Sequence, residues 1–503
     1  MKKVIYPFFT LLLMIATSCK KDYFDINQNP NSPTELSITP QLILPRVLQT
    51  TGSRVGTSFD YAAFWTGYWS RSGTYGQSIE IESYAITTGF QTGQWTGWYD
   101  VLTDINLMEK QANATQQPFF EGTAKTLKAI GFMYLVDQYN NVPYSKAFDI
   151  IGNILPAYDK GEDIYADLFV QLDAAAKLFA SAGATSATDA NTDIMFHGDT
   201  DKWRKLVNTM RLKLLIHESQ VVSAATVATV IGQINTDGSG YLGTGESASV
   251  NPGYAQADNQ QNPYYTTYKV SALGVTDQYN RANNYILNKF YGPDGIRNTA
   301  DDDIRYQYVF STAITPLSGN IYRGTNFGEV VPNNDPYRAS NQSDVAGPGL
   351  AKNPTQAQPI LTSTESLFMQ AEAMQRGWIT GSAQTTYENA IKESYSYLGA
   401  SATAANTYIT SNRVNFVIAS NKINQIVTQK YYSLIGLANF EAYVDYRRLG
   451  IPTDLPLSLN ANRLTNIIPL RLLYPQTEYN YNGANVATQG TINAQTSTIF
   501  WDK

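Results

Sequence analysis

The sequence predicts a mainly α-helical protein in which helical hairpins form the body and a loop-rich face with short strands lies on it. Apolar residues recur at spacings of three and four over several stretches, as in helices with one buried face. Two stretches, 363–376 and 382–398, are separated by a short loop, which indicates a helical hairpin. Segment 237–359 lacks this periodicity and is rich in Gly, Asn, Pro and Tyr.

The first eighteen residues have the three parts of a secretory signal peptide. Lys2 and Lys3 precede an apolar run, and small residues lead into Cys19, the one cysteine of the chain. This pattern is typical of a bacterial lipoprotein signal, although Ala16 stands where the usual lipobox has leucine. The alternative is an ordinary signal peptide with an incidental cysteine. We expect residues 1–18 to be removed and Cys19 to carry the acyl chains that tether the protein to a membrane.

Residues 19–45 are predicted to form an extended linker, because they contain several proline turns and no periodic apolar pattern. No later stretch approaches the roughly 20 apolar residues of a membrane-spanning helix. The lipid is therefore the expected membrane attachment.

Helices are predicted wherever a continuous apolar stripe occurs. These stretches are 121–138, 162–179, 201–218, 363–376 and 382–398, with further helices at 94–111 and 421–449. Ser382 is the expected N-cap of one helix and Gly399 its end, and the last stretch is expected to break near Gly436.

The aperiodic segment 237–359 is predicted to be ordered. Disordered chains are poor in aromatic residues, whereas this segment contains many tyrosines. Long ordered loops in a compact protein are usually functional. We expect loops and short strands packed on the helical body.

Composition favours a neutral polar ligand. The formal net charge is −6 and there is no basic run, which argues against nucleic acid and against electrostatic membrane binding. Charged residues make up 16% of the chain, below the usual level of about 25%. The 35 tyrosines offer apolar faces together with hydroxyl groups, a combination suited to binding surfaces.

Catalysis is disfavoured relative to binding. The two histidines, His197 and His217, do not form an HExxH pattern, and both are expected to be structural. There is no G-x-S-x-G element and no phosphate-binding loop. The acidic residues do not form a recognisable catalytic pair.

Several segments follow one another along the chain. Each is a weak signal of a protein family by itself, but their joint order is specific. They read DINQNPNSPTE after Cys19, AKTLKAIGFMYLVDQYNNVPYSKAF at 124–148, PAYDKGEDIYADLF at 156–169, FHGDTDKWRKLVNTMRLKL at 196–214, PILTSTESLFMQAEAMQRGW at 359–378, QKYYSLIGLANFEAYVDYRRLGIP at 429–452, IPLRLLYPQTEYNYN at 468–482 and IFWD at 499–502. In these segments the chain resembles the SusD/RagB family, within it the SusD-like starch-binding outer-membrane lipoproteins.

The resemblance covers nearly the whole mature chain and implies one SusD-like domain over residues 19–503, with TPR-like hairpins. It also implies an outer-membrane lipoprotein on the cell exterior of a Bacteroidetes species, partnered with a SusC-type TonB-dependent transporter. Binding loops vary in this family, so the resemblance does not identify the ligand.

Three functions remain open at this point. The chain delivers oligosaccharides to a transporter, delivers peptides in the same way, or serves as a periplasmic helical scaffold for protein partners. Abundant Tyr and Trp with few charges favour sugar, whose C–H faces stack on aromatic rings.

Two aromatic-rich segments are the candidate ligand platform. We expect Trp69 and Tyr75 to face one or more of Tyr264, Tyr265 and Tyr291 across the ligand. Tyr75 lies in the flexible sequence RSGTYGQS, whereas Trp69 could also share a buried helix face with an earlier tryptophan.

An acidic loop, YGPDGIRNTADDDIR, is a candidate structural calcium site. The oxygen ligands would come from Asp294, Asn298, Asp301, Asp302 and Asp303, and oxygen is the donor that calcium prefers. The spacing is not that of an EF-hand, and a solvated acidic turn is the alternative. No other cofactor is expected.

Overall fold

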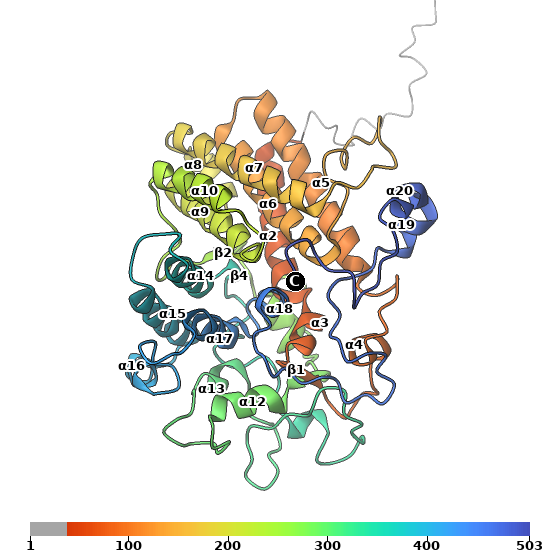
Figure 1. The fold of residues 1–503 in the computed structure, drawn as a ribbon, viewed down its shortest axis with the longest axis vertical. Coiled ribbons are helices and arrows are strands. Elements are labelled where there is room, and N and C mark those ends of the chain that lie inside the picture. The colour runs from red at the N-terminus through yellow and green to blue at the C-terminus, as the bar shows by residue number, and fades with distance from the viewer. Residues whose placement is uncertain (1–37, 503) are drawn as a thin grey trace, which may run out of the picture. The chain divides into compact units, whose positions relative to one another are not determined.

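The computed structural model describes residues 38–502 (Figure 1). The predicted signal peptide 1–18, the predicted lipidation site Cys19 and most of the predicted linker lie outside these residues. No helix within residues 38–502 has both the length and the apolar character needed to cross a bilayer.

The predicted linker ends too late in the chain. Helix α2 (Pro40–Thr57) begins at Pro40, so residues 40–45 are helical. Pro40 fits the first turn of a helix, where the amide that proline lacks would have no partner within the helix. The buried residues Leu44, Val47 and Leu48 then hold this helix against the core.

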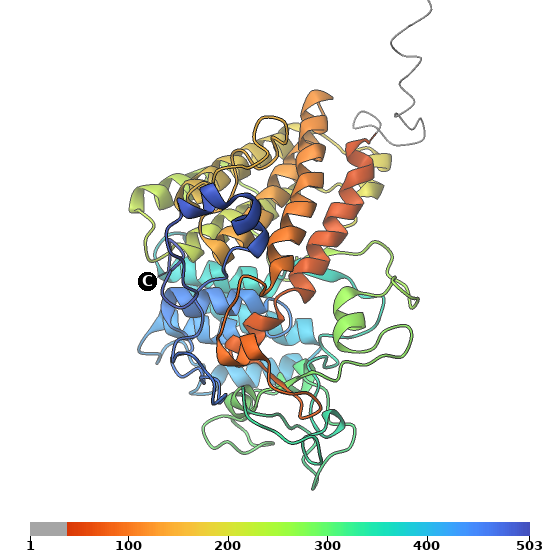
Figure 2. The ribbon, with the colours of Figure 1, turned by 90° about the vertical axis from the view of Figure 1, so that its right-hand side faces the viewer.

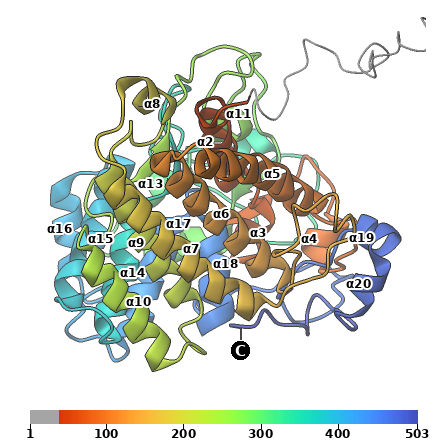
Figure 3. The ribbon, with the colours of Figure 1, turned by 90° about the horizontal axis from the view of Figure 1, so that it is seen from above.

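The first half of the helical body is formed by the helices between residues 92 and 237. They are α5 (Thr92–Ala114), α6 (Pro118–Tyr139), α7 (Gly161–Ser181), α8 (Ala187–Thr192), α9 (Thr200–His217) and α10 (Ala224–Asp237). Helix α6 packs between α5 and α7, while α2 and α9 also contact it (Figure 3). Because neighbours cover several sides, α6 is buried over most of its circumference. The predicted helices 94–111, 121–138, 162–179 and 201–218 are confirmed, with ends that differ by a few residues.

The second half of the body is formed by later helices. They are α14 (Ser363–Gln375), α15 (Ala383–Leu398), α16 (Ala402–Thr410), α17 (Lys422–Leu434) and α18 (Asn439–Leu449). The predicted hairpin is α14–α15, and the Ser382 side chain accepts a hydrogen bond from the amide of Thr385 as its N-cap. Gly399 ends α15 in the left-handed region. The predicted break near Gly436 separates α17 from α18, and Gly436 has φ of 71°.

The remaining elements are short. They are α3 (Asp60–Trp65), β1 (Trp69–Arg71), α4 (Ile79–Ser83), β2 (Ala248–Val250), α11 (Pro263–Tyr268), β3 (Asn280–Ala282), α12 (Asn284–Tyr291), α13 (Tyr306–Val309), η3 (Ala339–Asn341), β4 (Gln358–Leu361), α19 (Gln476–Tyr481) and α20 (Gly483–Ala487). The strands form two antiparallel pairs, β1 with β3 and β2 with β4. Trp69 lies opposite Ala282, so strand pairing brings the early loops beside the central segment. The mainly α fold class with loops and short strands is confirmed.

The C-terminal tail is packed into the helical body. The indole of Trp501 is fully buried and donates a hydrogen bond of 2.9 Å to Asp137. His217 lies between Asp137 and Glu441, at 3.0 and 2.9 Å, with 1% of its side chain exposed. Burial disfavours a charge on His217, but the two carboxylates outweigh it and raise its pKa. The expected structural role of His217 agrees with this position.

Candidate ligand-binding site

The loop that follows β1 is held against the central loops by backbone hydrogen bonds. The amide of Ser72 donates to the carbonyl of Tyr279 at 3.0 Å, and that of Gly73 to Tyr337 at 2.8 Å. A Cβ at Gly73 would lie 2.7 Å from the carbonyl oxygen of Pro332, so this approach requires glycine. Figure 2 shows the two sets of loops side by side at the lower end of the view.

Tyr75 is an exposed aromatic residue on this loop. Its side chain is 43% exposed, and its ring packs edge-on against Tyr279 with centroids 5.2 Å apart. The backbone carbonyl of Tyr75 accepts a hydrogen bond from Arg71, which also pairs with Glu82 in the interior. Tyr75 is thus accessible on an anchored loop, and its contact with a ligand stays a prediction.

The predicted exposure of Trp69 is wrong. Trp69 is fully buried in β1, where its ring packs edge-on against Tyr268 at 5.0 Å and against Phe64 at 6.5 Å. The same short sequence therefore contains one aromatic residue that belongs to the core and one that faces solvent. Side-chain spacing did not distinguish them, because strand pairing with β3 decides which residues are covered.

Of the predicted central tyrosines, Tyr264 and Tyr291 are buried and Tyr265 is partly exposed. Tyr264 is 3% exposed, and its hydroxyl donates a hydrogen bond of 2.8 Å to the carbonyl of Val345, so Tyr264 belongs to the core. Tyr291 is 8% exposed and contributes to a cavity of about 300 Å³, separate from the one that Tyr265 lines. The structure therefore does not assemble the predicted platform as a whole.

Tyr265 lines a cavity of about 700 Å³ formed by α11, α13 and the loops around β3 and η3. Phe310 and Tyr322 contribute aromatic surface to the same wall, while Gln307 and Gln342 contribute amides. Sequence reasoning missed three site residues: Gln307 in the short helix α13, Phe310 directly after it, and Gln342 directly after η3, all in a segment without a periodic pattern. Tyr322 lines both this cavity and the one that contains Tyr291, so the two hollows share a wall.

The cations that line the cavity already have partners in the protein. Arg281 donates to three backbone carbonyls, those of Ala339, Asn280 and Asp277, at 3.0, 2.6 and 3.1 Å. Lys269 donates to Ser311 at 2.6 Å and pairs with Asp344 at 3.4 Å. Burial lowers the pKa of Arg281, although nearby carboxylates oppose the shift.

The Lys352 ammonium group also has a partner. It donates at 2.5 Å to the backbone carbonyl of Tyr397, away from the cavity loops, and burial lowers its pKa. Together with the pairing of Arg281 and Lys269, this leaves the cavity without a cation set aside for an anionic ligand.

The predicted calcium ligands have hydrogen-bond and ion-pair partners within the protein, and calcium binding stays a prediction. Asp303 is fully buried, and Arg305 binds its two carboxylate oxygens through Nε at 2.9 and 3.1 Å. Asp302 instead accepts from the amide of Asn298 at 2.8 Å, while Asp301 accepts from a threonine hydroxyl. No three His, Cys, Asp or Glu side chains within residues 38–502 are arranged to hold a metal ion.

For the fifth predicted calcium ligand, Asp294, the carboxylate accepts a hydrogen bond from the amide of Ile296 within its own turn. The predicted calcium set is thus divided between local turns and a buried ion pair.

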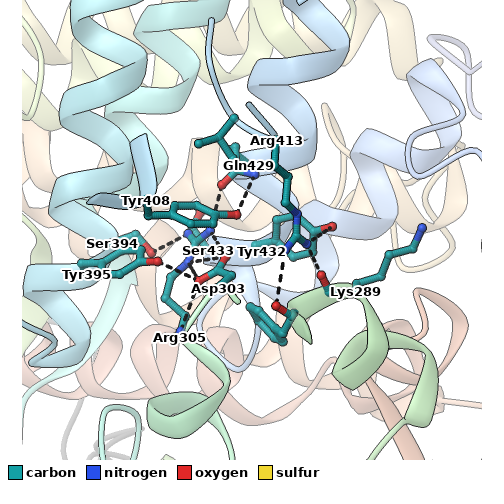
Figure 4. Close-up of polar contacts among 12 residues, drawn as sticks. Lys289, Asp303, Arg305, Ser394, Tyr395, Tyr408, Arg413, Gln429, Tyr432 and Ser433 are labelled. Atoms are coloured by element: carbon teal, nitrogen blue, oxygen red, sulfur yellow. Dashed lines mark hydrogen bonds and ion pairs between the residues drawn. The ribbon is translucent and has the colours of Figure 1, made fainter. Parts of the chain in front are cut away.

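That ion pair joins the loop segment to the helical body (Figure 4). Arg305 binds Asp303 at 2.6 Å, the side-chain oxygen of Gln429 in α17 at 2.8 Å, and Ser394 in α15 at 3.1 Å. The hydroxyl of Tyr395 donates to Asp303 at 3.0 Å. Burial disfavours both charges, but each charge outweighs this for its partner, so the pKa of Asp303 is lowered and that of Arg305 is raised. Arg305 directly precedes α13, so these contacts anchor the start of this part of the cavity wall to the helical body.

Comparison with known proteins gives a consistent family and fold. The sequence model of a SusD-like family, described as starch-binding and associating with the outer membrane, matches residues 30–475. No curated protein matches the chain in sequence.

Several solved structures share the fold over almost the whole chain. A SusD homolog from Bacteroides fragilis is 24% identical, with 93% of this chain and 100% of that chain covered and a TM-score of 0.74. A chitin-binding SusD homolog from Flavobacterium johnsoniae is 21% identical, with coverage of 92% and 98% and a TM-score of 0.73. A SusD/RagB family protein from Bacteroides thetaiotaomicron is 18% identical, with coverage of 92% and 99% and a TM-score of 0.72.

Proposed function

Because the chain belongs to the SusD-like family of starch-binding proteins that associate with the outer membrane, we propose that it captures an oligosaccharide and passes it to a SusC-type TonB-dependent transporter. The cavity lined by Tyr265 carries this proposal. Its volume of about 700 Å³ lies within the range of ligand sites, roughly 300–1,000 Å³. The protein acts by binding and leaves the covalent structure of the ligand unchanged.

The chemistry of the cavity supports a sugar ligand over a peptide. Tyr265, Phe310 and Tyr322 offer aromatic surface on which the C–H faces of a sugar ring pack. Amide and hydroxyl groups of the wall offer hydrogen bonds to sugar hydroxyls. A peptide more often requires an open strand edge or charged clamps, and the cations of this wall are engaged within the protein.

Titration calorimetry with maltoheptaose, N-acetylchitohexaose and a set of short peptides tests the proposal. We expect binding of at least one oligosaccharide, with no change in its chain length after incubation. Tyr265→Ala should weaken that binding roughly tenfold or more, as stacked aromatic residues often dominate affinity. Tyr481→Ala, on the exposed face of α19, is the control and should bind normally. Binding of peptides alone would establish the alternative ligand.

We propose that lipid on Cys19 holds the protein in the outer membrane, facing the cell exterior. The signal-like sequence before Cys19 and the family description support this proposal. Cys19→Ser should move the protein from the membrane fraction to the soluble fraction, since the acyl chains are the proposed attachment. Retention of this variant in the membrane fraction would refute the anchor while leaving the ligand proposal intact.

A further inference from the structure

Gln342 is an unusual member of the cavity wall. Its side chain is 2% exposed and lines the cavity, yet neither its amide nitrogen nor its amide oxygen has a hydrogen-bond partner within residues 38–502. Buried amide groups are nearly always bonded, because an unpaired donor or acceptor costs free energy. The orientation of Gln342 therefore needs a reason other than folding.

The backbone around Gln342 is held on both sides. Before it, the Asn341 side chain donates to the backbone carbonyl and the hydroxyl of Thr315, at 2.8 and 2.9 Å. After it, the amide of Ser343 donates to the carbonyl of Arg323 at 2.8 Å. With both neighbours fixed, the backbone that carries Gln342 is held beside the cavity that this residue lines, and a selective binding group requires such support.

In contrast to Gln342, the cationic side chains of the same wall have partners within the protein. Arg281 donates to backbone carbonyls, and Lys269 pairs with Asp344. Gln342 is neutral, and its side-chain amide offers an NH2 donor group beside an oxygen acceptor. A ligand group that pairs with this amide must satisfy both the donor and the acceptor, because whichever is left unpaired costs free energy.

We propose that the Gln342 amide selects an uncharged ligand by pairing with one group that both accepts and donates a hydrogen bond. Two neighbouring hydroxyls of a sugar ring offer this chemistry, and so does an acetamido group. The inference rests on the proposed sugar-binding function and adds a specificity-determining residue. A carboxylate or sulfate offers acceptors alone and would leave the amide oxygen of Gln342 unpaired.

The test is a pair of matched substitutions in the full chain. Gln342→Met keeps the side-chain size and removes both hydrogen-bonding atoms. We expect it to weaken binding of the preferred neutral oligosaccharide roughly tenfold or more. The Tm should stay at the wild-type value or rise, because no internal hydrogen bond is broken.

The control is Gln138→Met in α6. Gln138 is 1% exposed, accepts from the hydroxyl of Tyr61 at 2.9 Å and donates to the carbonyl of Tyr134 at 2.8 Å. We expect this variant to lower the Tm and to keep wild-type affinity. The two glutamines thus predict opposite results for the same substitution.

The ligands identify the recognised group. Maltoheptaose offers hydroxyl groups and N-acetylchitohexaose also offers acetamido groups. The ligand whose affinity falls in Gln342→Met therefore shows which of these groups pairs with the Gln342 amide. Gln342→Glu should lose the neutral ligand as well, because the amide donor is replaced by a charged acceptor. Oligogalacturonate should bind the wild type weakly.

Several outcomes would overturn the inference. Wild-type affinity in Gln342→Met removes the selective role while the sugar-binding function stands. A fall in Tm equal to that of Gln138→Met means that the amide is bonded inside the fold. Tighter wild-type binding of oligogalacturonate than of the neutral chains refutes selection for an uncharged ligand. Absence of binding to any oligosaccharide overturns both the function and this inference.

Discussion

The helical body and the loop-rich segment 237–359 both bury polar side chains, and both leave some of them without a hydrogen-bond partner within residues 38–502, but the two regions differ in whether such a group lines the large cavity. In the body, His217 lies between two carboxylates, and Arg448 binds Glu372 and Asp445, each at 2.7 Å. In the loop segment, Asp303 and Arg305 are paired where they meet the helices. Beside the cavity, the side-chain amide of Gln342 has no hydrogen-bond partner among residues 38–502.

This difference separates groups that hold the fold from groups that meet a ligand. A polar group that stabilises a structure needs a partner inside the protein. A group that recognises a ligand is more useful when its hydrogen bonds are unfilled and its position is fixed. The loop segment contains both kinds: Asp303 and Arg305 contact the helices, and Gln342 lines the cavity.

The largest expected effect comes from breaking the contact between the two regions. Asp303→Ala leaves the Arg305 guanidinium buried without its carboxylate, which should reduce the free energy of unfolding by about 3–5 kcal/mol. Urea denaturation measures this change. Glu162→Ala removes an exposed ion pair with Lys160 and should change stability by about 1 kcal/mol or less. Equal stability of the two variants would show that the loop segment does not depend on this pair.

Trp69 in β1 and Tyr75 in the loop after it provide a second test, because one is buried and the other is exposed. Trp69→Ala empties a fully buried site and should cost about 3–5 kcal/mol of unfolding free energy. Tyr75→Ala removes a side chain that is 43% exposed and should change stability by about 0.5 kcal/mol or less. We expect Tyr75→Ala to weaken oligosaccharide binding roughly tenfold. Normal binding by Tyr75→Ala would confine the site to the cavity itself.

A smaller effect is the pH dependence of the free energy of unfolding, to which the two regions contribute with opposite signs. Burial raises the pKa of Glu218, which follows α9, to about 7, with nearby His217 opposing the shift. A raised folded-state pKa contributes stability below the unfolded value, about 4.5, and this contribution is lost as pH rises through about 7. The loss is at most ~3 kcal/mol. The raised pKa of His217 acts in the same direction.

Asp303 in the loop segment acts in the reverse direction. Despite burial, Arg305 lowers the pKa of Asp303, so its stabilising contribution is present above the unfolded value, about 3.8, and is lost as pH falls through the folded value. Urea titrations at pH 5 and pH 8 measure the combined effect of Glu218 and His217, and Glu218→Gln should reduce the pH dependence between them by the share that Glu218 contributes. An unchanged slope in Glu218→Gln would show that other groups produce it.

Local sequence patterns predicted the helices because a helix is specified by neighbours three and four residues apart. The stripe within 121–138 marks α6, and Ser382 and Gly399 mark the ends of α15. The same rules failed at Pro40, where a residue typical of turns begins a helix. Proline also suits the first turn of a helix, so the interpretation of Pro40 as a turn was wrong, and the apolar face that follows it, with Leu44 and Val47, packs α2 against the core.

The candidate site was only partly predictable. Tyr75 and Tyr265 were expected at the ligand-facing surface and are at least partly exposed, whereas Trp69, Tyr264 and Tyr291 are buried. Their burial depends on partners far along the chain, such as β3 for Trp69 and Val345 for Tyr264. No local spacing records such contacts.

The sequence by itself determined the helical class of this protein, the hairpin of α14 and α15, the loop-rich nature of segment 237–359 and membership of the SusD-like family. Only the tertiary structure decided which aromatic side chains are accessible, that Asp303 forms a buried ion pair with Arg305, and that Gln342 lines a cavity. The physical reason is range: periodicity and caps act within a few residues, whereas burial and hydrogen-bond partnership are set when distant segments pack together.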